Sequence, residues 1–134
     1  KEITIVLVKN PVGLNQVIDM VGTESEPFSF VGLLNANYAD GIDTSWIWDG
    51  NFEKLTQMPI QQYMTGGERY KDITFRLKVA GVEDNQLWTY DNLKDAVSNI
   101  KNLPTKRVYV FATYTAMLQL RKQLATEGYI KEGI

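Results

Sequence analysis

Short apolar segments alternate with helical patterns along this chain, and that alternation limits the folds open to it. Runs rich in β-branched and aromatic residues predict strands at residues 3–8, 28–34, 60–64, 86–90 and 107–112. Apolar residues at helical spacing follow most of these runs, and glycines at positions 22, 81 and 128 lie at the ends of helical stripes. Strands joined through helices by short connections predict an α/β fold. We expect a Rossmann-like three-layer domain with a mostly parallel central sheet of about five strands.

The chain has the size and continuity of a single domain. Its 134 residues fall in the usual range for one hydrophobic core, and no linker, repeat or low-complexity segment interrupts the pattern. We therefore expect residues 1–134 to form one domain. The first apolar run is too short for a signal peptide or a membrane span, and the chain begins inside it. We expect a domain excised from the C-terminus of a longer polypeptide.

The composition removes several kinds of chemistry. The chain contains no cysteine and no histidine, so by itself it cannot form a disulfide, a thiolate zinc site, a cysteine nucleophile or a Ser-His pair. Basic residues number 14 and acidic residues 16, for a net charge of −2, without a long run of either sign. This balance argues against nucleic acid and against a polybasic membrane surface. Any chemistry relies on carboxylates, lysines, amides and hydroxyls, or on another chain.

Polar segments follow the predicted strands at the points where those strands end. They are residues 9–11 after the first strand, 35–49 after the second, 65–69 after the third and 113–115 after the fifth. The carboxyl ends of parallel strands share one edge of the sheet, and open α/β sheets bind ligands at that edge. We expect these segments to line one edge of the molecule.

The second of these segments is unusual because it combines acidic and indole side chains. Its aspartates and tryptophans are Asp40, Asp43, Asp49, Trp46 and Trp48. In one interpretation, a carboxylate at the sheet edge acts beside two indoles that exclude water. In another, the tryptophans fill the core under a long loop while Asp43 or Thr44 caps a short helix. A Mg²⁺ site is a third interpretation, although the spacing matches no calcium-loop pattern.

The other segments also allow a structural and a functional interpretation. Lys9 and Asn10 could hold an anionic substrate or form an ordinary strand-to-helix turn. In the string TGGER, backbone N–H groups could bind a phosphate oxygen or make a plain tight turn, and the chain contains no Walker-type or dinucleotide motif. Thr113 or Thr115 is expected to cap the last helix.

Long strings in the chain match one known family in order and spacing. They are LVKNPVGLNQ, LLNANYADGIDTSWIWDGNFE, GGERYKDITFRLKVAGV and VYVFATYTAMLQLRKQLA, and they cover nearly the whole chain. ADGIDTSWIWD is the specific part, and KNPVG and TYTAM support it. Together these strings resemble the C-terminal domain of MurT, the Mur-ligase-like subunit of lipid II isoglutaminyl synthase. The resemblance implies a Mur ligase C-terminal-like fold.

The resemblance also implies an activity and partners. In that family, ATP-dependent amidation converts the D-glutamate of the lipid II stem peptide to D-isoglutamine during peptidoglycan biosynthesis. The MurT subunit activates the carboxylate as an acyl phosphate, and a glutaminase subunit, GatD, releases ammonia from glutamine. Domains absent from this chain would hold most of the ATP and Mg²⁺, so we expect this domain alone to need no cofactor and to be inactive. The complex would be cytoplasmic, acting at the inner face of the bacterial membrane without inserting into it.

Carried over residue by residue, the resemblance gives Asp43 a catalytic role. This residue, the second aspartate of DGID, would complete the Cys-His pair of the glutaminase across the subunit interface. The missing histidine and cysteine are then expected, because both lie on the partner.

Other candidate site residues come from the resemblance and from the sheet edge. Lys9, Asn10 and Asn15 occupy the place of a motif that lines the cleft in related ligases. The expected substrate contacts are Lys9, Asn10, Asn15, Asn35, Asn37, Asp40, Thr113 and Tyr114. The glycine-rich turn makes Gly66, Gly67 and Arg69 the expected cofactor contacts, and no residue is assigned to a metal.

Two other functions stay open at this stage. The domain could be a pure docking or scaffold module for the glutaminase, whose triad would then be complete without Asp43. It could also be a self-contained flavodoxin-like domain that binds a small ligand or Mg²⁺. An Asp43→Asn change tests the first alternative, and a saturable tryptophan-fluorescence response to Mg²⁺ or ATP would indicate the second.

Overall fold

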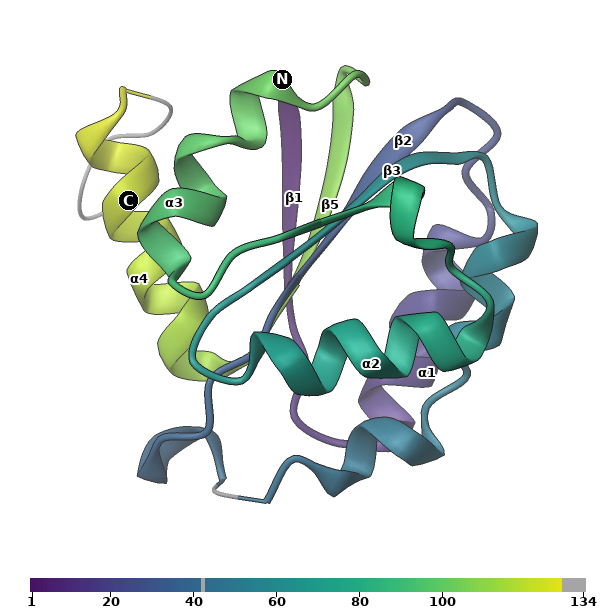
Figure 1. Ribbon diagram of the computed structural model, residues 1–134, viewed down its shortest axis with the longest axis horizontal. Coiled ribbons are helices and arrows are strands. Elements are labelled where there is room, and N and C mark those ends of the chain that lie inside the picture. The colour runs from purple at the N-terminus through teal and green to yellow at the C-terminus, as the bar shows by residue number, and fades with distance from the viewer. Residues whose placement is uncertain (42, 129–134) are drawn as a thin grey trace.

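A parallel sheet forms the centre of the molecule (Figure 1). The structure is a computed structural model that describes residues 1–41 and 43–128. Its five strands lie in the order β1-β5-β2-β3-β4, and every neighbouring pair runs parallel. The strands are β1 (Glu2–Leu7), β2 (Phe28–Leu33), β3 (Ile60–Gly66), β4 (Leu87–Thr89) and β5 (Arg107–Ala112). The predicted parallel α/β sheet is therefore confirmed.

Helices cover both faces of this sheet and complete the predicted three layers. One face carries α1 (Pro11–Val21) and α2 (Tyr70–Ala80), and the other carries α3 (Leu93–Ser98) and α4 (Tyr114–Thr126) (Figure 1). Among the described residues, no helix is both long enough and apolar enough to cross a membrane.

The connection from β2 to β3 runs along the carboxyl edge of the sheet as short 3₁₀ helices. These are η1 (Tyr38–Asp40), η2 (Ser45–Asp49) and η3 (Phe52–Gln57). Figure 1 shows this connection below the sheet, beginning near α4 and passing beneath α2 toward α1. Two further 3₁₀ helices, η4 (Asp84–Gln86) and η5 (Ile100–Asn102), precede β4 and follow α3.

Strand β2 shows why its sequence is apolar without interruption. Phe28 and Phe30 pack into the core on the side of α1 and α2, whereas Val31 and Leu33 belong to the core on the side of α3 and α4. All six residues of β2 are buried. A central parallel strand covered by helices on both faces loses the alternation of polar and apolar residues that an exposed strand would have.

The strand order determines which polar segments meet. Strand β5 lies between β1 and β2, with Ala112 in register with Leu7 on one side and Leu33 on the other. The residues that follow these strands, 8–10, 34–37 and 113–115, therefore leave the sheet side by side. On the other side of β2, Gly66 of β3 is in register with Leu33, so residues 67–69 leave the sheet at the same place. All four expected polar segments thus share one edge. The sequence alone predicted the edge but not this order.

Two helix ends follow the rules of residue type. Gly81, which follows α2, has a φ of 118°, the left-handed conformation expected of a glycine after a helix. Helix α3 begins after Asn92, whose side chain accepts the backbone N–H of Asp95 at 2.9 Å and so caps the helix.

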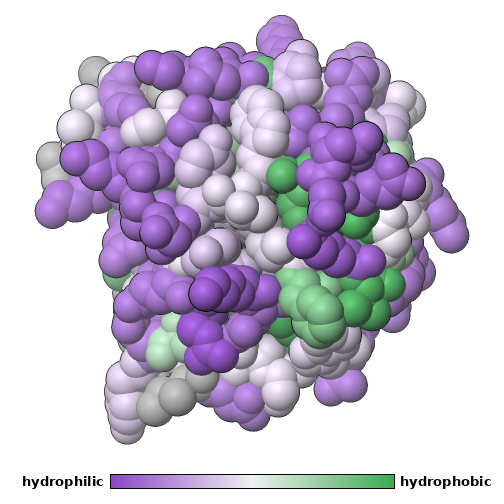
Figure 2. All heavy atoms as spheres, viewed as in Figure 1, coloured by the Kyte–Doolittle hydropathy of each residue, from purple (hydrophilic) through white to green (hydrophobic). Residues whose placement is uncertain are grey.

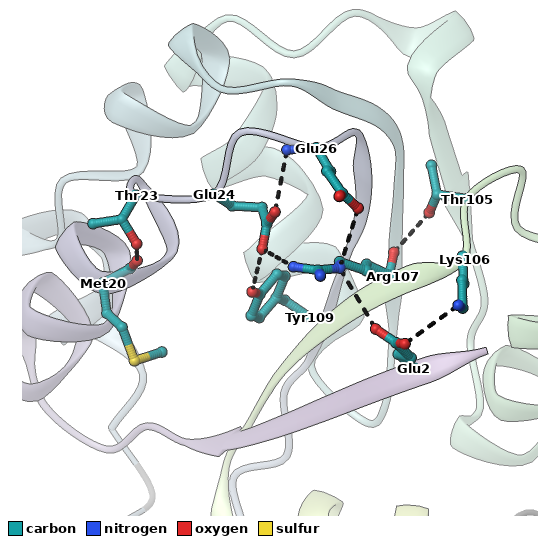
Figure 3. Close-up of polar contacts among 9 residues, drawn as sticks. All are labelled: Glu2, Met20, Thr23, Glu24, Glu26, Thr105, Lys106, Arg107 and Tyr109. Atoms are coloured by element: carbon teal, nitrogen blue, oxygen red, sulfur yellow. Dashed lines mark hydrogen bonds and ion pairs between the residues drawn. The ribbon is translucent and has the colours of Figure 1, made fainter.

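A cluster of ion pairs lies at the opposite, amino-terminal edge of the sheet and joins its strands there (Figure 3). The guanidinium of Arg107 lies 2.6 Å from Glu24 and 3.5 Å from both Glu2 and Glu26. The Tyr109 hydroxyl donates to the same Glu24 carboxylate at 3.0 Å. The backbone N–H of Glu26, followed by the Tyr109 and Arg107 side chains, lowers the pKa of Glu24, although burial acts against them. This cluster joins β1 and β5 to the connection that leads into β2.

Candidate functional site

Asn35 and Thr113 join the ends of β2 and β5, and both are buried. The Asn35 backbone N–H donates to the Thr113 hydroxyl at 3.0 Å, and that hydroxyl donates to the Asn35 carbonyl at 3.3 Å. The Asn35 amide group donates to Thr115 (3.1 Å) and Gln119 (3.2 Å), while its Oδ1 accepts the backbone N–H of Glu68 (3.0 Å). The fold itself uses these polar groups. Asn35 and Thr113 therefore build the edge, and their expected substrate contacts stay a prediction.

Asp40 caps α4 from a distant part of the chain. Its carboxylate accepts the backbone N–H of Thr115 at 2.6 Å and also the Thr115 hydroxyl. The backbone N–H of Asn37 donates to it at 3.0 Å, and the Asn37 amide group donates to Thr115 at 3.1 Å. Thr113 occupies the cap position but makes no side-chain bond to the helix. The buried Asp40 carboxylate stabilises the positive end of α4, and its expected substrate contact stays a prediction.

Lys9 and Tyr114 line a pocket at the ends of β1 and β5. The pocket has a volume of about 280 Å³, and Leu7, Ala39 and Asp40 complete its lining. Both the lysine and the tyrosine are exposed. Of the substrate contacts expected from the sequence, Lys9, Asp40 and Tyr114 line this pocket, and Asn35 lines a second one.

Asn10 and Asn15 instead stabilise the turns around α1. The Asn10 Oδ1 accepts the backbone N–H of Gly13 at 2.8 Å, which caps α1. The Asn15 Oδ1 accepts the backbone N–H of Asn51 at 2.7 Å, which joins α1 to the start of η3. The strand-to-helix turn interpretation therefore accounts for Asn10.

Asp43 presents a fixed carboxylate at the surface. Its Oδ1 accepts the backbone N–H of Ser45 at 2.9 Å, and its Oδ2 accepts the Ser45 hydroxyl at 3.0 Å. These bonds, the backbone N–H first, lower the pKa of Asp43. Asp49, at the end of η2, is also exposed. In the parts of the chain that the structure describes, no group of three acidic side chains is placed to hold a metal ion.

Arg76 of α2 holds the segment that follows Asp43. It is only 3% exposed. Its guanidinium donates to the carbonyls of Ile47 (3.0 Å) and Gly50 (2.7 Å) and makes two bonds to the Glu53 carboxylate (2.8 and 2.7 Å). This arginine therefore connects α2 to η2 and η3 at once.

The two tryptophans of η2 have different environments. Trp46 is half-buried and packs against the core between the sheet and α1. Trp48 is 46% exposed, lies over Arg76 at 5.3 Å from the guanidinium carbon to the ring centroid, and meets Phe75 edge-on at 5.7 Å between centroids. One indole thus fills the core, as the structural interpretation expected, and the other lies at the surface.

The glycine-rich turn after β3 is explained by packing and backbone conformation. A Cβ atom on Gly66 would lie 2.6 Å from the Cβ of Ala96 in α3. Gly67 has a φ of 106°, and a Cβ there would lie 2.6 Å from the Leu34 carbonyl oxygen. Both positions require glycine without any ligand.

The donors at this turn are already used inside the protein. The backbone N–H of Glu68 donates to Asn35 at 3.0 Å, and that of Arg69 donates to the Leu34 carbonyl at 2.9 Å. The Arg69 guanidinium pairs with Asp72 at 2.5 Å. This geometry does not fit a phosphate cradle, so we place no nucleotide at Gly66, Gly67 and Arg69.

Sequence reasoning missed some residues that organise this edge. The side-chain oxygen of Gln119 accepts a hydrogen bond from the Asn35 amide group. The pair of Arg76 and Glu53 connects α2 to η2 and η3. The sequence contains a clue to the burial of Arg76. It lies three residues after Ile73 and next to Leu77, so it falls at the apolar stripe of α2. A second pocket, of about 460 Å³, opens beside Gly67, between α3 and α4.

These features define a class of protein. A three-layer domain with an all-parallel sheet, whose carboxyl edge combines a lysine-lined pocket with a fixed surface carboxylate, is an α/β domain of the Mur ligase C-terminal type. Residues 7–117 match the MurT ligase C-terminal family. The chain belongs to that family.

Named relatives agree with this assignment. The chain is 47% identical over 132 residues to the lipid II isoglutaminyl synthase (glutamine-hydrolyzing) subunit MurT of Streptococcus pneumoniae, a match that covers 98% of this chain and 30% of that protein. It is 45% identical over 84 residues to the subunit of the same name from Staphylococcus aureus, covering 62% of this chain and 19% of the relative. The chain thus spans less than a third of the length of these relatives.

Proposed function

We propose that this chain is the C-terminal domain of the amidating subunit of a lipid II isoglutaminyl synthase, that it docks a GatD-like glutaminase, and that it supplies Asp43 to the Cys-His pair of that partner. The relatives are named as subunits of a glutamine-hydrolysing synthase. The observation that carries the proposal is the exposed Asp43 carboxylate, held in place by Ser45.

The proposed role needs an ionised carboxylate at a fixed position. In a triad, the aspartate accepts a hydrogen bond from the imidazole, sets its tautomer and stabilises the imidazolium that forms. The bonds from the Ser45 backbone N–H and hydroxyl lower the pKa of Asp43 and so favour the ionised form that this role needs. Ser45 uses one acceptor site on each oxygen, and a carboxylate has about four, so both oxygens can still accept a bond from an incoming imidazole. The chain contains no histidine, so that imidazole belongs to the partner.

Comparison of the three aspartates favours Asp43. Asp40 is buried and bonded to α4, so it is closed to a partner. Asp49 is exposed like Asp43, but among the described residues no hydrogen bond or ion pair holds its carboxylate in one orientation. Asp49 therefore makes a matched control.

In the whole enzyme, the product would be D-isoglutamine in the lipid II stem peptide, formed from ammonia that the glutaminase releases. We assign ATP and Mg²⁺ to other parts of the subunit, because the turn at Gly66 and Gly67 leaves few donors for a phosphate. Lys9 and Tyr114 would face the ligase cleft through their shared pocket. We place the complex in the bacterial cytoplasm, at the inner face of the membrane that carries its lipid-linked substrate.

Glutaminase turnover in the reconstituted two-subunit complex tests the proposal. Asp43→Asn should lower turnover by about 10³- to 10⁴-fold, as expected when a triad aspartate is lost. Gel filtration should show an intact complex, since the amide keeps the size of the side chain. Asp49→Asn should leave turnover unchanged. If the Asp43→Asn complex hydrolyses glutamine as fast as wild type, the domain acts only as a docking module.

A further inference from the structure

Three side chains form an exposed apolar surface beside the Asp43 segment. Trp48 of η2 and Phe75 and Val79 of α2 are 46%, 59% and 54% exposed. We call them the α2 surface. Figure 2 shows hydrophobic side chains gathered on the face that Figure 1 shows covered by α2, amid a mostly polar surround.

The α2 surface is not the buried side of an amphipathic helix. Ile73 and Leu77 turn to the sheet and are buried. Phe75 and Val79 are four residues apart and so share the opposite face of the helix. Their exposure leaves apolar area in contact with water, which favours covering by another molecule.

This surface is held rigid from beneath. Arg76 lies under Trp48 and donates to two backbone carbonyls of the η2–η3 segment, at Ile47 and Gly50. The edge contact with Phe75 fixes the exposed indole against α2. A surface that is already ordered loses little conformational entropy on binding, which favours affinity.

The α2 surface is continuous with the Asp43 carboxylate. Segment 43–48 runs alongside α2: the Thr44 hydroxyl donates to Asp72 at 3.0 Å in the first turn, and Trp48 meets Phe75 one turn further on. A partner whose imidazole bonds to Asp43 would therefore also contact these apolar side chains.

We propose that the α2 surface is the docking site for the glutaminase subunit, with Trp48 and Phe75 as its central contacts. This inference rests on the proposed function. Large aromatic side chains dominate the energy of many interfaces, surrounded by a polar rim. Asp43 and the half-exposed Glu53 make the η2 side of this rim acidic, which fits a partner that presents a histidine.

Composition argues against a second copy of this chain as the occupant. The chain contains no histidine, so a second copy has no imidazole to offer Asp43. The carboxylate would then be covered without the partner that it needs.

The test uses the full-length subunit that contains this domain, immobilised and titrated with the glutaminase of the same organism in biolayer interferometry. Val79→Lys and Phe75→Ser should each weaken binding about tenfold or more, because both changes remove apolar contact and the first adds a charge. Met20→Lys is the matched control: Met20 is 52% exposed near the end of α1. It should change the dissociation constant by less than about twofold.

The outcomes separate this inference from the proposed function. If both α2 variants bind the glutaminase as tightly as wild type, the docking site is wrong. If Asp43→Asn still reduces turnover in that case, the role of Asp43 stands. A wild-type subunit that does not bind the glutaminase would overturn both. A wild-type subunit that self-associates, and becomes monomeric with Val79→Lys, would assign the surface to a second copy. Far-UV circular dichroism of the two variants should match that of wild type, since both side chains are exposed.

Discussion

At the scale of single residues, Arg76 explains the acidic, tryptophan-rich segment better than any ligand does. A buried guanidinium is costly unless its donors are paired. Here two carbonyls and a carboxylate accept its bonds, and the rings of Trp48 and Phe52 lie 5.3 and 5.1 Å from its carbon. The segment after Asp43 takes its conformation from this arginine.

Replacing Arg76 with methionine should therefore destabilise the domain strongly. We expect a loss of about 2–4 kcal/mol, because two backbone carbonyls lose their donor in a buried place. Glu53→Gln removes the charge at the other end of the same pair, and the Glu53 side chain is half exposed, so it should cost less than about 1 kcal/mol. Urea unfolding measures both. Equal losses for the two variants would contradict this view of Arg76.

Asp40 allows a second prediction at this scale. Asp40→Ala removes the acceptor for the Thr115 backbone N–H at the start of α4, and we expect a loss of about 1–2 kcal/mol in the free energy of unfolding. Thermal unfolding followed by circular dichroism measures it. A variant as stable as wild type, with weaker binding of the lipid-linked substrate, would support the substrate role that the sequence suggested.

Sequence reasoning placed these residues correctly but did not predict their structural task. Asn35, Asp40 and Thr113 do lie at the carboxyl edge of the sheet, as their position after apolar strands predicted. Their burial could not be predicted, because it depends on α4 and η1 meeting across the ends of β2 and β5. Polar residues after a strand look alike in sequence whether they face a ligand or another loop.

At the scale of elements, regular segments were predictable and the long connection was not. The strands and the apolar stripes of the helices follow from periodicity, as with Ile73 and Leu77 on the buried side of α2. The 3₁₀ helices of residues 38–57 were not predicted beyond one short helix near Asp43. They are held by tertiary bonds, above all those of Arg76, instead of by a local repeat of apolar residues.

The cluster at the amino-terminal edge gives an element-level prediction about pH (Figure 3). The pKa of Glu24 is lowered from 4.5 by the Glu26 backbone N–H and then by Tyr109 and Arg107. The bonds of its carboxylate therefore stabilise the fold above that pH and are lost as the pH falls through the lowered value. Glu24→Gln should reduce stability at about pH 7, and its difference from wild type should shrink by about pH 3.

Urea unfolding at both pH values measures this difference. Glu26→Gln is the control, because Glu26 is exposed and lies 3.5 Å from Arg107 without the 2.6 Å contact that Glu24 makes. Its effect should be smaller at neutral pH. A Glu24→Gln difference that stays the same in acid would show that the cluster does not carry the pH dependence.

At the scale of the whole molecule, the two edges of the sheet have different tasks. The amino-terminal edge is tied by ion pairs around Arg107, and the carboxyl edge carries the Lys9 pocket, the Asp43 carboxylate and the α2 surface. The strand order creates this division, because β5 brings the ends of β1 and β2 together. Sequence periodicity contains no information on that order, so the sequence predicted the edge without predicting which strand ends would meet.

The pKa of the glutaminase histidine in the intact complex tests the central claim most directly. NMR titration of that imidazole, labelled with ¹⁵N, should give a pKa that falls by about one unit when Asp43 becomes asparagine, because a neighbouring carboxylate favours the charged imidazolium. Asp49→Asn should leave it unchanged. An imidazole pKa that is the same with Asp43 and with asparagine would contradict a triad shared between the two chains.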